Sequence, residues 1–376
     1  MSNTLGVGII GCGNISTTYF DFAPLFRGLE IHACADMNMD AAHARATEYG
    51  VTAYDVAGLL AAPEVDIVLN LTIPDAHAPI TMQALEVGKH VYSEKPLVLS
   101  IEDGRAMRDL ADRKGLRVGC APDTFLGGAH QLARAAVDEG RIGSITAGTA
   151  HVMGHGMEHW HPNPDFFYAP GGGPILDIGP YYIANLINIL GPVSRVGALT
   201  SSAYKERTIS STERAGETVP VLTPTNIHAL LEFTNGTTIT LSTSWDVWSH
   251  RHSHMELYGT EGTLFLPDPN FFGGDVECSI RDEEPVKIDP GDHPFGIPNQ
   301  GDSQANYRTA GLADMALALM EGRDHRCSLE RTLHGVDVMT SILKSGETGS
   351  FIDLQTTCTR PDALGPEAAR GLLING

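Results

Sequence analysis

The sequence has no long apolar run and no surplus of positive charge. No stretch reaches the roughly 20 apolar residues that a membrane-spanning helix needs, and no basic, apolar leader precedes Gly6. The chain has 25 Lys and Arg against 46 Asp and Glu, a formal charge of −21. Such a surface repels polyanions, so we expect neither nucleic acid nor an anionic membrane as a partner. These absences predict a cytoplasmic protein.

The sequence also lacks cysteine pairs with metal or redox spacing, internal repeats and low-complexity segments. Its six cysteines are scattered, and no two of them form a C-x-x-C pair. Cys12, Cys34 and Cys120 fall in or beside apolar segments, so we expect them to be small core residues rather than disulfide partners or metal ligands. The 376 residues are enough for two domains.

A glycine-rich turn follows the first apolar segment. Residues 5–10 have the length of a strand, and Gly11 and Gly13 come directly after them. The first glycine allows a tight turn, and the second lets a pyrophosphate approach the backbone and the N-terminus of the next helix. Ser16 stands at the third position of G-x-G-x-x-G and is small enough for close packing. The pattern predicts a dinucleotide site.

The end of the second strand indicates which dinucleotide. Residues 31–35 form an apolar strand that ends at Asp36, where a carboxylate suits the adenosine ribose hydroxyls. The same charge would repel a 2′-phosphate, and the next three residues include no arginine. NAD is therefore favoured over NADP. The alternative is that Asp36 caps the helix expected from Asp40 onward.

Residues 1–123 alternate strands and helices, which is typical of a parallel, doubly wound α/β sheet, the Rossmann arrangement. We expect its strands near 5–10, 31–35, 51–54, 66–71, 90–92 and 116–120. Ligands of such sheets bind at the carboxyl ends of the strands. The predicted cofactor-binding residues are Gly11, Gly13, Asn14, Ile15, Asp36, Leu71, Thr72, His77, Glu94, Lys95 and Asp123.

Residues 124–376 predict a second, α+β domain for substrate binding and oligomerisation. Its longer strand-like runs predict a large, mainly antiparallel, open-faced sheet, with strands near 145–153, 194–203, 227–234, 237–245, 253–258 and 262–266. Helices are expected near 128–140, from the triple glycine at 171–173, and near 308–321 and 329–344. Residues 267–305 are rich in Gly, Pro and Asp and are predicted to be a long excursion.

Several motifs in this order resemble the Gfo/Idh/MocA family of oxidoreductases, over nearly the whole chain. They are the glycine turn, Glu94-Lys95-Pro96, Gly171-Gly172-Gly173 with Asp177-Ile178-Gly179, and Leu257-Tyr258-Gly259-Thr260-Glu261-Gly262-Thr263. The resemblance implies an NAD(P)-dependent oxidoreductase of sugars, cyclitols or related polyols, with the nicotinamide between the two domains. It also implies that the open sheet forms the oligomer contact, as in a homodimer or homotetramer.

Lys95 and Asp177 are the first two candidate catalytic residues. Lys95 follows a strand end, and its ammonium can bind the reacting oxygen and stabilise negative charge that develops there. By its family position, Asp177 would hold a substrate hydroxyl or orient the acid/base group. The alternatives are a solvated lysine in a turn and an aspartate that caps a helix.

Tyr181 is the third candidate and a departure from the family. The commonest pattern has histidine four residues after the aspartate, whereas this chain has tyrosine there. On one helix, Asp177 and Tyr181 would share a face. Free phenols ionise near pH 10, so Tyr181 would need a nearby cation such as Lys95 to accept a proton. Alternatively, Tyr181 only packs or binds substrate, and Lys95 or a histidine transfers the proton.

The histidines cluster in residues 151–165. His155, Glu158 and His159 formally match the zinc signature H-x-x-E-H, but that signature requires a helix, and glycine and proline flank it here. We therefore expect no metal and a substrate-pocket loop, in which Trp160 stacks on a sugar ring while His155, Glu158 and His161 bond hydroxyls. The alternative is a surface loop with incidental histidines.

The predicted substrate-binding residues come from both domains. They are Lys95, Thr124, His155, Trp160, His161, Asp177 and Tyr181. Residues 245–252, expected on the sheet, are interpreted as an interface or pocket rim. Residues 306–308 also resemble a site segment.

The favoured function is an NAD-dependent dehydrogenase that oxidises a secondary hydroxyl of a sugar, glycoside or cyclitol. One rival is an NAD-dependent glycoside hydrolase or lyase that works by transient oxidation and elimination. Another is a non-catalytic NAD-sensing protein. Net release of NADH separates the dehydrogenase from the hydrolase.

Overall fold

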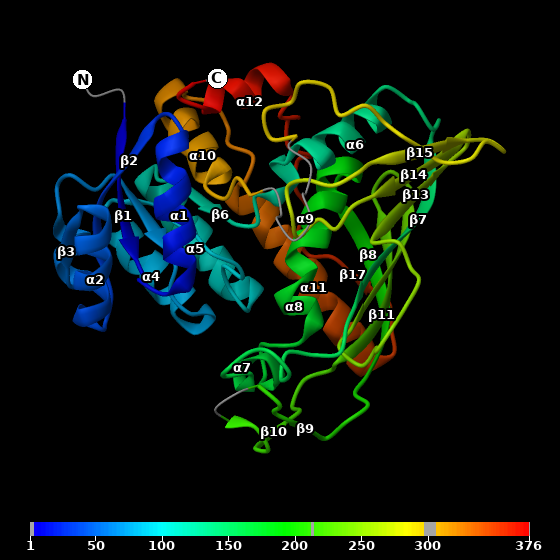
Figure 1. Ribbon diagram of the computed structural model, residues 1–376, viewed down its shortest axis with the longest axis horizontal. Coiled ribbons are helices and arrows are strands. Elements are labelled where there is room, and N and C mark those ends of the chain that lie inside the picture. Colours follow the sequence, from blue (N-terminus) through cyan, green and yellow to red (C-terminus); the bar gives the residue numbers. More distant parts are fainter. Residues whose placement is uncertain (1–3, 212–213, 297–305, 376) are drawn as a thin grey trace.

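A computed structural model describes residues 4–211, 214–296 and 306–375. Figure 1 shows two parts side by side: a smaller sheet with its helices, in blue to cyan, and a larger sheet covered by helices on one face. In the described ranges, no helix is long and apolar enough to cross a membrane.

The first sheet confirms the predicted Rossmann arrangement. Its strand order is β3-β2-β1-β4-β5-β6, and every pairing in it is parallel. The strands are β1 (Leu5–Ile10), β2 (Leu29–Ala35), β3 (Thr52–Tyr54), β4 (Ile67–Asn70), β5 (His90–Ser93) and β6 (Val118–Cys120). The helices between them are α1 (Asn14–Phe22), α2 (Met39–Tyr49), α3 (Val56–Ala61), α4 (Pro74–Glu86) and α5 (Ile101–Lys114).

The start of α2 corrects one alternative for Asp36. The cap of this helix is Asn38, whose side chain accepts a hydrogen bond from the backbone N–H of Asp40. Asp36 therefore does not cap α2, and its carboxylate is turned toward the glycine-rich turn instead.

The second sheet is mainly antiparallel, as predicted. Its order is β16-β15-β14-β13-β7-β12-β11-β8-β17, and only β7 and β12 pair in parallel. The strands are β7 (Ile145–Met153), β8 (Val193–Ser201), β11 (Asn226–Phe233), β12 (Thr238–Ser244), β13 (Met255–Gly259), β14 (Gly262–Leu266), β15 (Glu277–Ile280), β16 (Val286–Lys287) and β17 (Ile352–Asp353). A separate hairpin pairs β9 (Glu206–Thr208) with β10 (Thr218–Pro220).

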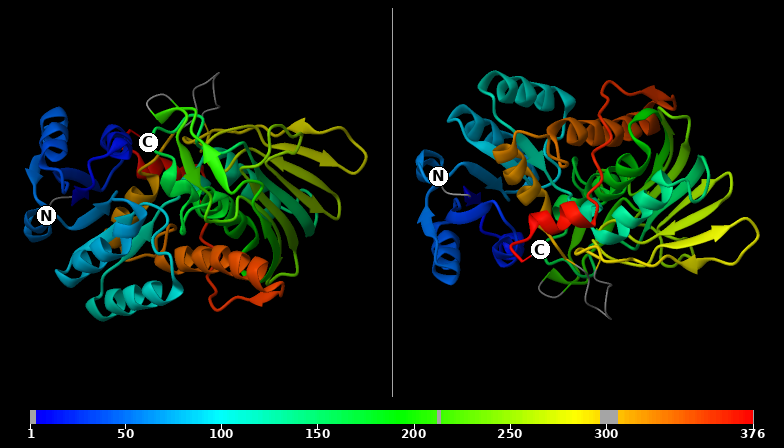
Figure 2. Two further views of the ribbon diagram at one scale, coloured as in Figure 1. Left: turned by 90° about the horizontal axis from the view of Figure 1, so that it is seen from below. Right: turned by 90° about the horizontal axis from the view of Figure 1, so that it is seen from above.

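Helices cover one face of this sheet and leave the other open (Figure 2). The covering helices are α6 (Gly128–Asp138), α9 (Gly179–Leu190) and α11 (Leu329–Thr348). On β11 the side chains alternate, so Ala229 and Leu231 are buried while Leu230 is 51% exposed. The open face is the one predicted to form the oligomer contact.

Two expectations for the second domain were wrong. Residues 267–305 were predicted to be a long excursion, yet β15 and β16 lie within this range and extend the sheet; residues 297–305 lie outside the described part. Residues 245–252 were expected on the sheet but form a loop between β12 and β13.

Two late helices pack against the first domain. Side chains of α10 (Ala310–Glu321) and α12 (Pro366–Leu372) share a hydrophobic cluster with β1 and α1. The C-terminal helices α10 and α12 therefore follow the second sheet in the sequence but pack against the first. This packing places residue 308, just before α10, near the carboxyl end of β5.

All six cysteines are free and buried, which confirms the interpretation of Cys12, Cys34 and Cys120 as core residues.

Three histidines inside the fold allow a prediction of how the free energy of unfolding depends on pH. Burial lowers the pKa of His130, His325 and His334 to about 4, below the value near 6.5 of an unfolded chain. Between these values the unfolded state binds more protons, so the free energy of unfolding should fall as pH falls from 6.5 to 4.

The expected slope is about 1 kcal/mol per pH unit for each such histidine. Urea unfolding at pH 7.0, 6.0 and 5.0 measures it. His325→Gln should reduce this slope by the contribution of one histidine, about 1 kcal/mol per pH unit. The same replacement of the exposed His43 should leave the slope unchanged. A stability that stays constant over this range would contradict the prediction.

Candidate active site

The glycine-rich turn has the geometry of a phosphate site. Gly11 has φ +106°, and a Cβ there would lie 2.5 Å from the backbone oxygen of Leu71, so only glycine fits. A Cβ on Gly13 would meet nothing within 4 Å, which leaves open space in front of the N-terminus of α1. The buried Ser16 donates from its hydroxyl to the oxygen of Gly13 at 2.6 Å and closes the turn.

Asp36 joins the ends of β1 and β2. Its Oδ2 accepts from the backbone N–H of Cys12, and its Oδ1 accepts from that of Asn38, both at 2.8 Å. Each oxygen keeps a second lone pair for a ribose hydroxyl. The carboxylate thus lies beside the glycine-rich turn, as a dinucleotide site requires.

The loops after β4 and β5 are fastened to each other by His77. This buried ring lies 2.9 Å from the oxygen of Thr72 through Nε2 and 2.6 Å from that of Pro96 through Nδ1. Asn70, which the sequence analysis missed, accepts from the Thr72 hydroxyl at 2.7 Å. His77 thus positions the loop that carries Lys95, whereas its contact with a cofactor stays a prediction.

Lys95, Asp177 and Tyr181 lie together. The Lys95 ammonium donates to Oδ1 of Asp177 at 3.0 Å and to its backbone oxygen at 2.7 Å. It also lies 5.2 Å from the centre of the Tyr181 ring. The lysine side chain is only 16% exposed, so it is not a solvated lysine in a turn.

The helix that was expected to carry both Asp177 and Tyr181 is broken. Asp177 ends α8 (Pro174–Asp177), and α9 begins at Gly179, with Ile178 between them. Pro180 cannot donate a backbone hydrogen bond, so one continuous helix could not pass through it. Asp177 caps neither helix, which excludes the alternative of a capping role.

Charges around Lys95 keep it protonated. Burial alone would lower the pKa of Lys95, but the negative charge that Tyr181 and Asp177 can carry outweighs burial and raises the pKa above its usual value. A fixed positive charge suits a group that stabilises an oxyanion. It does not suit a proton acceptor, which was the other role considered for Lys95.

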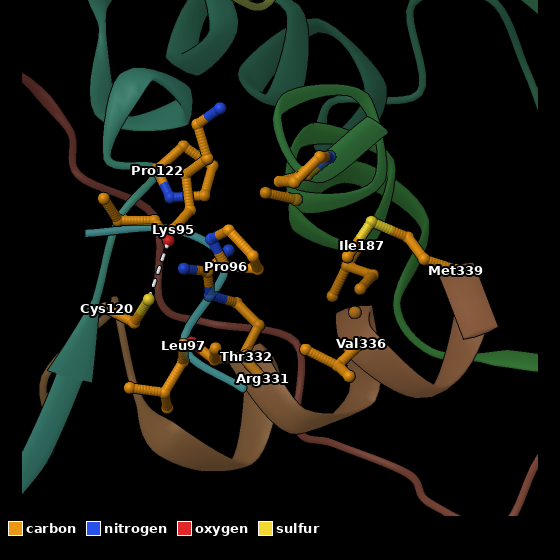
Figure 3. A pocket seen from close by; sticks show the side chains of 14 residues that line it. Lys95, Pro96, Leu97, Cys120, Pro122, Ile187, Arg331, Thr332, Val336 and Met339 are labelled. Atoms are coloured by element: carbon orange, nitrogen blue, oxygen red, sulfur yellow. Dashed lines mark hydrogen bonds between the residues drawn. The ribbon is translucent and has the colours of Figure 1, made fainter. Parts of the chain in front are cut away.

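Figure 3 shows the pocket behind the loop that carries Lys95. Leu97, Ile187, Val336 and Met339 line it, so apolar side chains from the loop, α9 and α11 support the lysine from behind. An apolar backing strengthens the electrostatic interactions of a charge beside it.

Glu94 and Arg308 form a second charged pair beside the first. Arg308 donates to Oε1 of Glu94 at 3.2 Å, and the hydroxyl of Tyr19 donates to the same oxygen at 3.0 Å. Burial would raise the pKa of Glu94, but the charges of Arg308 and Lys95 hold it below its ordinary value. Tyr19 gave no signal in the sequence, since nothing local marks a tyrosine in α1 as a partner of Glu94.

Asp123 and Thr124 are buried. Asp123 accepts from the backbone N–H groups of Thr309 and Gly311, at 3.2 and 3.0 Å, and so holds the first turn of α10. Thr124 begins the short 3-10 turn η2 (Thr124–Leu126) and is 1% exposed. Their predicted contacts with cofactor and substrate remain predictions.

The histidine-rich segment is a loop, as the flanking glycines and prolines predicted. It leads from β7 into α7 (Asp165–Tyr168), and among the described residues no hydrogen bond links its histidine rings to Lys95, Asp177 or Tyr181. The His155 ring stacks on that of Trp248, whereas His161 contacts Trp160 edge-on. In the described ranges, no group of three or more His, Cys, Asp or Glu could hold a metal ion.

One member of this loop differs from its expected role. Glu158 was expected to bond a substrate hydroxyl, but it is 5% exposed and accepts from Arg207 at 3.0 Å and from the Tyr168 hydroxyl. Both carboxylate oxygens of Glu158 therefore already accept hydrogen bonds from protein side chains. Arg207 lies 49 residues away in the chain, and the sequence analysis missed it because no local pattern links the two.

Comparison with known proteins gives two family matches. The family described as "Oxidoreductase family, NAD-binding Rossmann fold" matches residues 5–121, and "GFO/IDH/MocA C-terminal domain" matches residues 130–265. The chain is 26% identical to levoglucosan dehydrogenase of Pseudarthrobacter phenanthrenivorans, over 93% of this chain and 98% of the relative.

Two further relatives match over less of their length. D-glucoside 3-dehydrogenase of Escherichia coli is 29% identical over 68% of this chain and 74% of the relative. 1,5-Anhydro-D-fructose reductase of Ensifer adhaerens is 32% identical over 46% of this chain, which spans about half (52%) of that relative. Among solved structures, levoglucosan dehydrogenase in complex with NADH and levoglucosan has the same fold, with TM-score 0.79, 21% identity and coverage of 93% and 99%.

The glycine-rich turn, the position of Asp36 and the paired Lys95 and Asp177 thus occur on the fold and within the sequence matches of one family. The chain belongs to the Gfo/Idh/MocA family of oxidoreductases and has its NAD-binding Rossmann domain.

Proposed function

We propose that this protein is a dehydrogenase that oxidises a secondary hydroxyl of a sugar, glycoside or cyclitol with NAD. The observation that carries the proposal is the Lys95 ammonium, held by Asp177 beside Tyr181 at the carboxyl end of the sheet. The names of the relatives, which include a levoglucosan dehydrogenase and a D-glucoside 3-dehydrogenase, support a carbohydrate substrate.

The proposed mechanism divides the work among three side chains. An ammonium has three N–H donors, and Asp177 takes two of those of Lys95. The third N–H of Lys95 has no acceptor among the described residues, so it can donate to the substrate oxygen. Among the same residues the Tyr181 hydroxyl has no hydrogen-bond partner. As a phenolate beside the Lys95 ammonium, its oxygen can accept the proton that leaves the substrate oxygen and become a neutral phenol.

When bound, the nicotinamide supplies the hydride acceptor. The open space at Gly13 and the lone pairs of Asp36 fit the pyrophosphate and ribose of such a cofactor. Lys95 then stabilises the charge that develops on oxygen while the proton moves to Tyr181. Both side chains are largely buried, which keeps water from competing for the reacting oxygen.

Absorbance at 340 nm measures the proposed reaction. Purified protein with NAD is screened against aldoses, inositols and methyl glycosides, and at least one of them should give stoichiometric NADH. Cleavage of a glycoside without net NADH would instead favour the hydrolase or lyase. Binding of NAD with no turnover of any sugar would favour the sensing protein.

Cofactor choice gives a separate prediction. Asp36→Ala combined with Met37→Arg should increase kcat/KM for NADP relative to NAD, because a repelling carboxylate is lost and a phosphate ligand gained. Met37 is 95% exposed, so an arginine has room there. The matched control is Asp40→Ala, which removes an exposed carboxylate four residues on and should leave the ratio unchanged. A wild type that binds NADP at least as tightly as NAD would contradict the assignment.

We also propose a cytoplasmic homodimer or homotetramer that associates through the open sheet face. The exposed Leu199 and Leu230 lie on adjacent strands of that face and support this contact. Sedimentation velocity checks it: Leu199→Asp with Leu230→Asp should give monomers.

A further inference from the structure

A small module with its own hydrophobic cluster sits at one end of the second domain. It consists of the loop 154–164, α7, and the β9–β10 hairpin, and its buried core is Phe167, Tyr168, Val219 and Trp245. Figure 1 shows α7 and the hairpin below α8. Both are therefore at the lower end of the second domain in that view. Figure 2 shows the same region from below.

Buried charges fasten this module. Arg207 is 4% exposed and donates to Glu158 at 3.0 Å, to the oxygen of Trp245 at 2.9 Å, and to Asp246. The hydroxyl of Tyr168 donates to the second oxygen of Glu158. Removing one partner of a buried ion pair is costly, so these contacts hold the loop in one arrangement.

Two large aromatic rings project from this fastened base. Trp160 is 58% exposed and Phe166 is 52% exposed. The ring of His161 lies edge-on to both, with centroid distances of 5.3 and 5.4 Å, and so links them into one surface. Exposed aromatic side chains that are held in place by packing are typical of a binding surface.

The segment that carries this surface is hydrogen-bonded, through its backbone, to the segment that carries Asp177. The N–H of Gly173 donates to the oxygen of Phe167 at 2.7 Å, and the N–H of Asp177 donates to the oxygen of Gly173 at 3.1 Å. Gly171 adjoins Leu99, four residues after Lys95; a Cβ built on the glycine would lie 3.4 Å from Cδ1 of Leu99. Two backbone hydrogen bonds therefore connect Phe167, next to Phe166, with Asp177, which holds Lys95.

The described charges near the surface are paired but leave a small negative excess. Asp165, next to Phe166, pairs with Arg214, which also donates to Glu217 at 2.8 Å, so two carboxylates share one guanidinium. The exposed aromatic rings suit a ring with an apolar face, either an aryl group or a pyranose. The negative excess does not suit an anionic group.

We propose that Trp160 and Phe166 form a second subsite, which binds a ring that the substrate carries beside the sugar that is oxidised. This inference rests on the proposed dehydrogenase function and narrows its substrate class. The preferred substrates are glycosides whose aglycone is an aryl ring or a second sugar, rather than free monosaccharides.

The test compares three glycosides of the one sugar that supports NAD reduction: methyl, phenyl and disaccharide. Wild-type kcat/KM should be about tenfold higher with a ring aglycone than with methyl, the size expected for one stacking interaction. Trp160→Ala and Phe166→Ala should each lower kcat/KM for the ring glycosides more than for the methyl glycoside, and so remove most of that preference. A larger loss with phenyl identifies an aryl ring, and a larger loss with the disaccharide identifies a sugar.

Phe351→Ala is the matched control, because Phe351 is 60% exposed but lies beside β17 on the large sheet. It should leave all three substrates unchanged. Equal use of the three glycosides by the wild type would overturn the second subsite while leaving the dehydrogenase intact. If no sugar or glycoside reduces NAD, the proposed function fails, and this inference fails with it.

Discussion

Replacing Lys95 with methionine should lower kcat at least 100-fold, the scale expected for losing an electrostatic or acid–base group. The ammonium is held by Asp177 and its side chain is only 16% exposed, so methionine removes a largely buried charge. NAD affinity, measured by fluorescence titration, should change little, because the phosphate and adenosine sites lie at the glycine-rich turn and Asp36.

The controls separate catalysis from folding. Lys344→Met removes an exposed lysine on α11 and should leave kcat unchanged. Lys95→Met leaves Asp177 without its cation, which by itself can lower the melting temperature. The double variant Lys95→Met with Asp177→Asn removes both charges, so it should recover stability and not activity. Near-normal turnover in the folded single variant would refute the role of Lys95.

The first domain could be predicted in detail because its signals are local. The glycines directly after β1 and the carboxylate directly after β2 are each recognised from neighbouring residues, although the approach of Gly11 to Leu71 is tertiary. The alternative in which Asp36 caps α2 was wrong by two residues, because the cap is Asn38. The sequence alone does not show which of two nearby capping side chains, Asp36 or Asn38, begins the helix, because both residue types are good helix caps.

The candidate site could be predicted only where its residues occur in short motifs. Lys95 and Asp177 were found through such motifs, although they meet across 82 residues. Arg207 was missed, and Arg308 was noted only as part of residues 306–308. Each contacts its carboxylate partner through tertiary packing, which no short motif marks. The break at Ile178 is different: Pro180 is a local signal for it, but the spacing of Asp177 and Tyr181 was given more weight.

Replacing Tyr181 with phenylalanine should lower kcat by roughly 10²- to 10⁴-fold, the range expected for losing a general base. The substitution keeps the ring that packs beneath the Lys95 ammonium and removes only the hydroxyl, so KM should change much less. The matched control is Tyr182→Phe. Its hydroxyl is 3.1 Å from Nδ1 of His254, so this variant also loses a buried hydroxyl but should keep its turnover.

The decisive comparison is with the histidine loop. His155 stacks on Trp248 and His161 packs against Trp160, so neither ring is joined to the Lys95 cluster by a hydrogen bond among the described residues. His155→Ala and His161→Ala should therefore retain kcat within about tenfold, because they remove packing rather than the proton acceptor. If Tyr181→Phe keeps most of its turnover while one histidine variant is inactive, the loop supplies the base. In that case Tyr181 only packs against Lys95 or binds substrate, and its departure from the family pattern has no catalytic role.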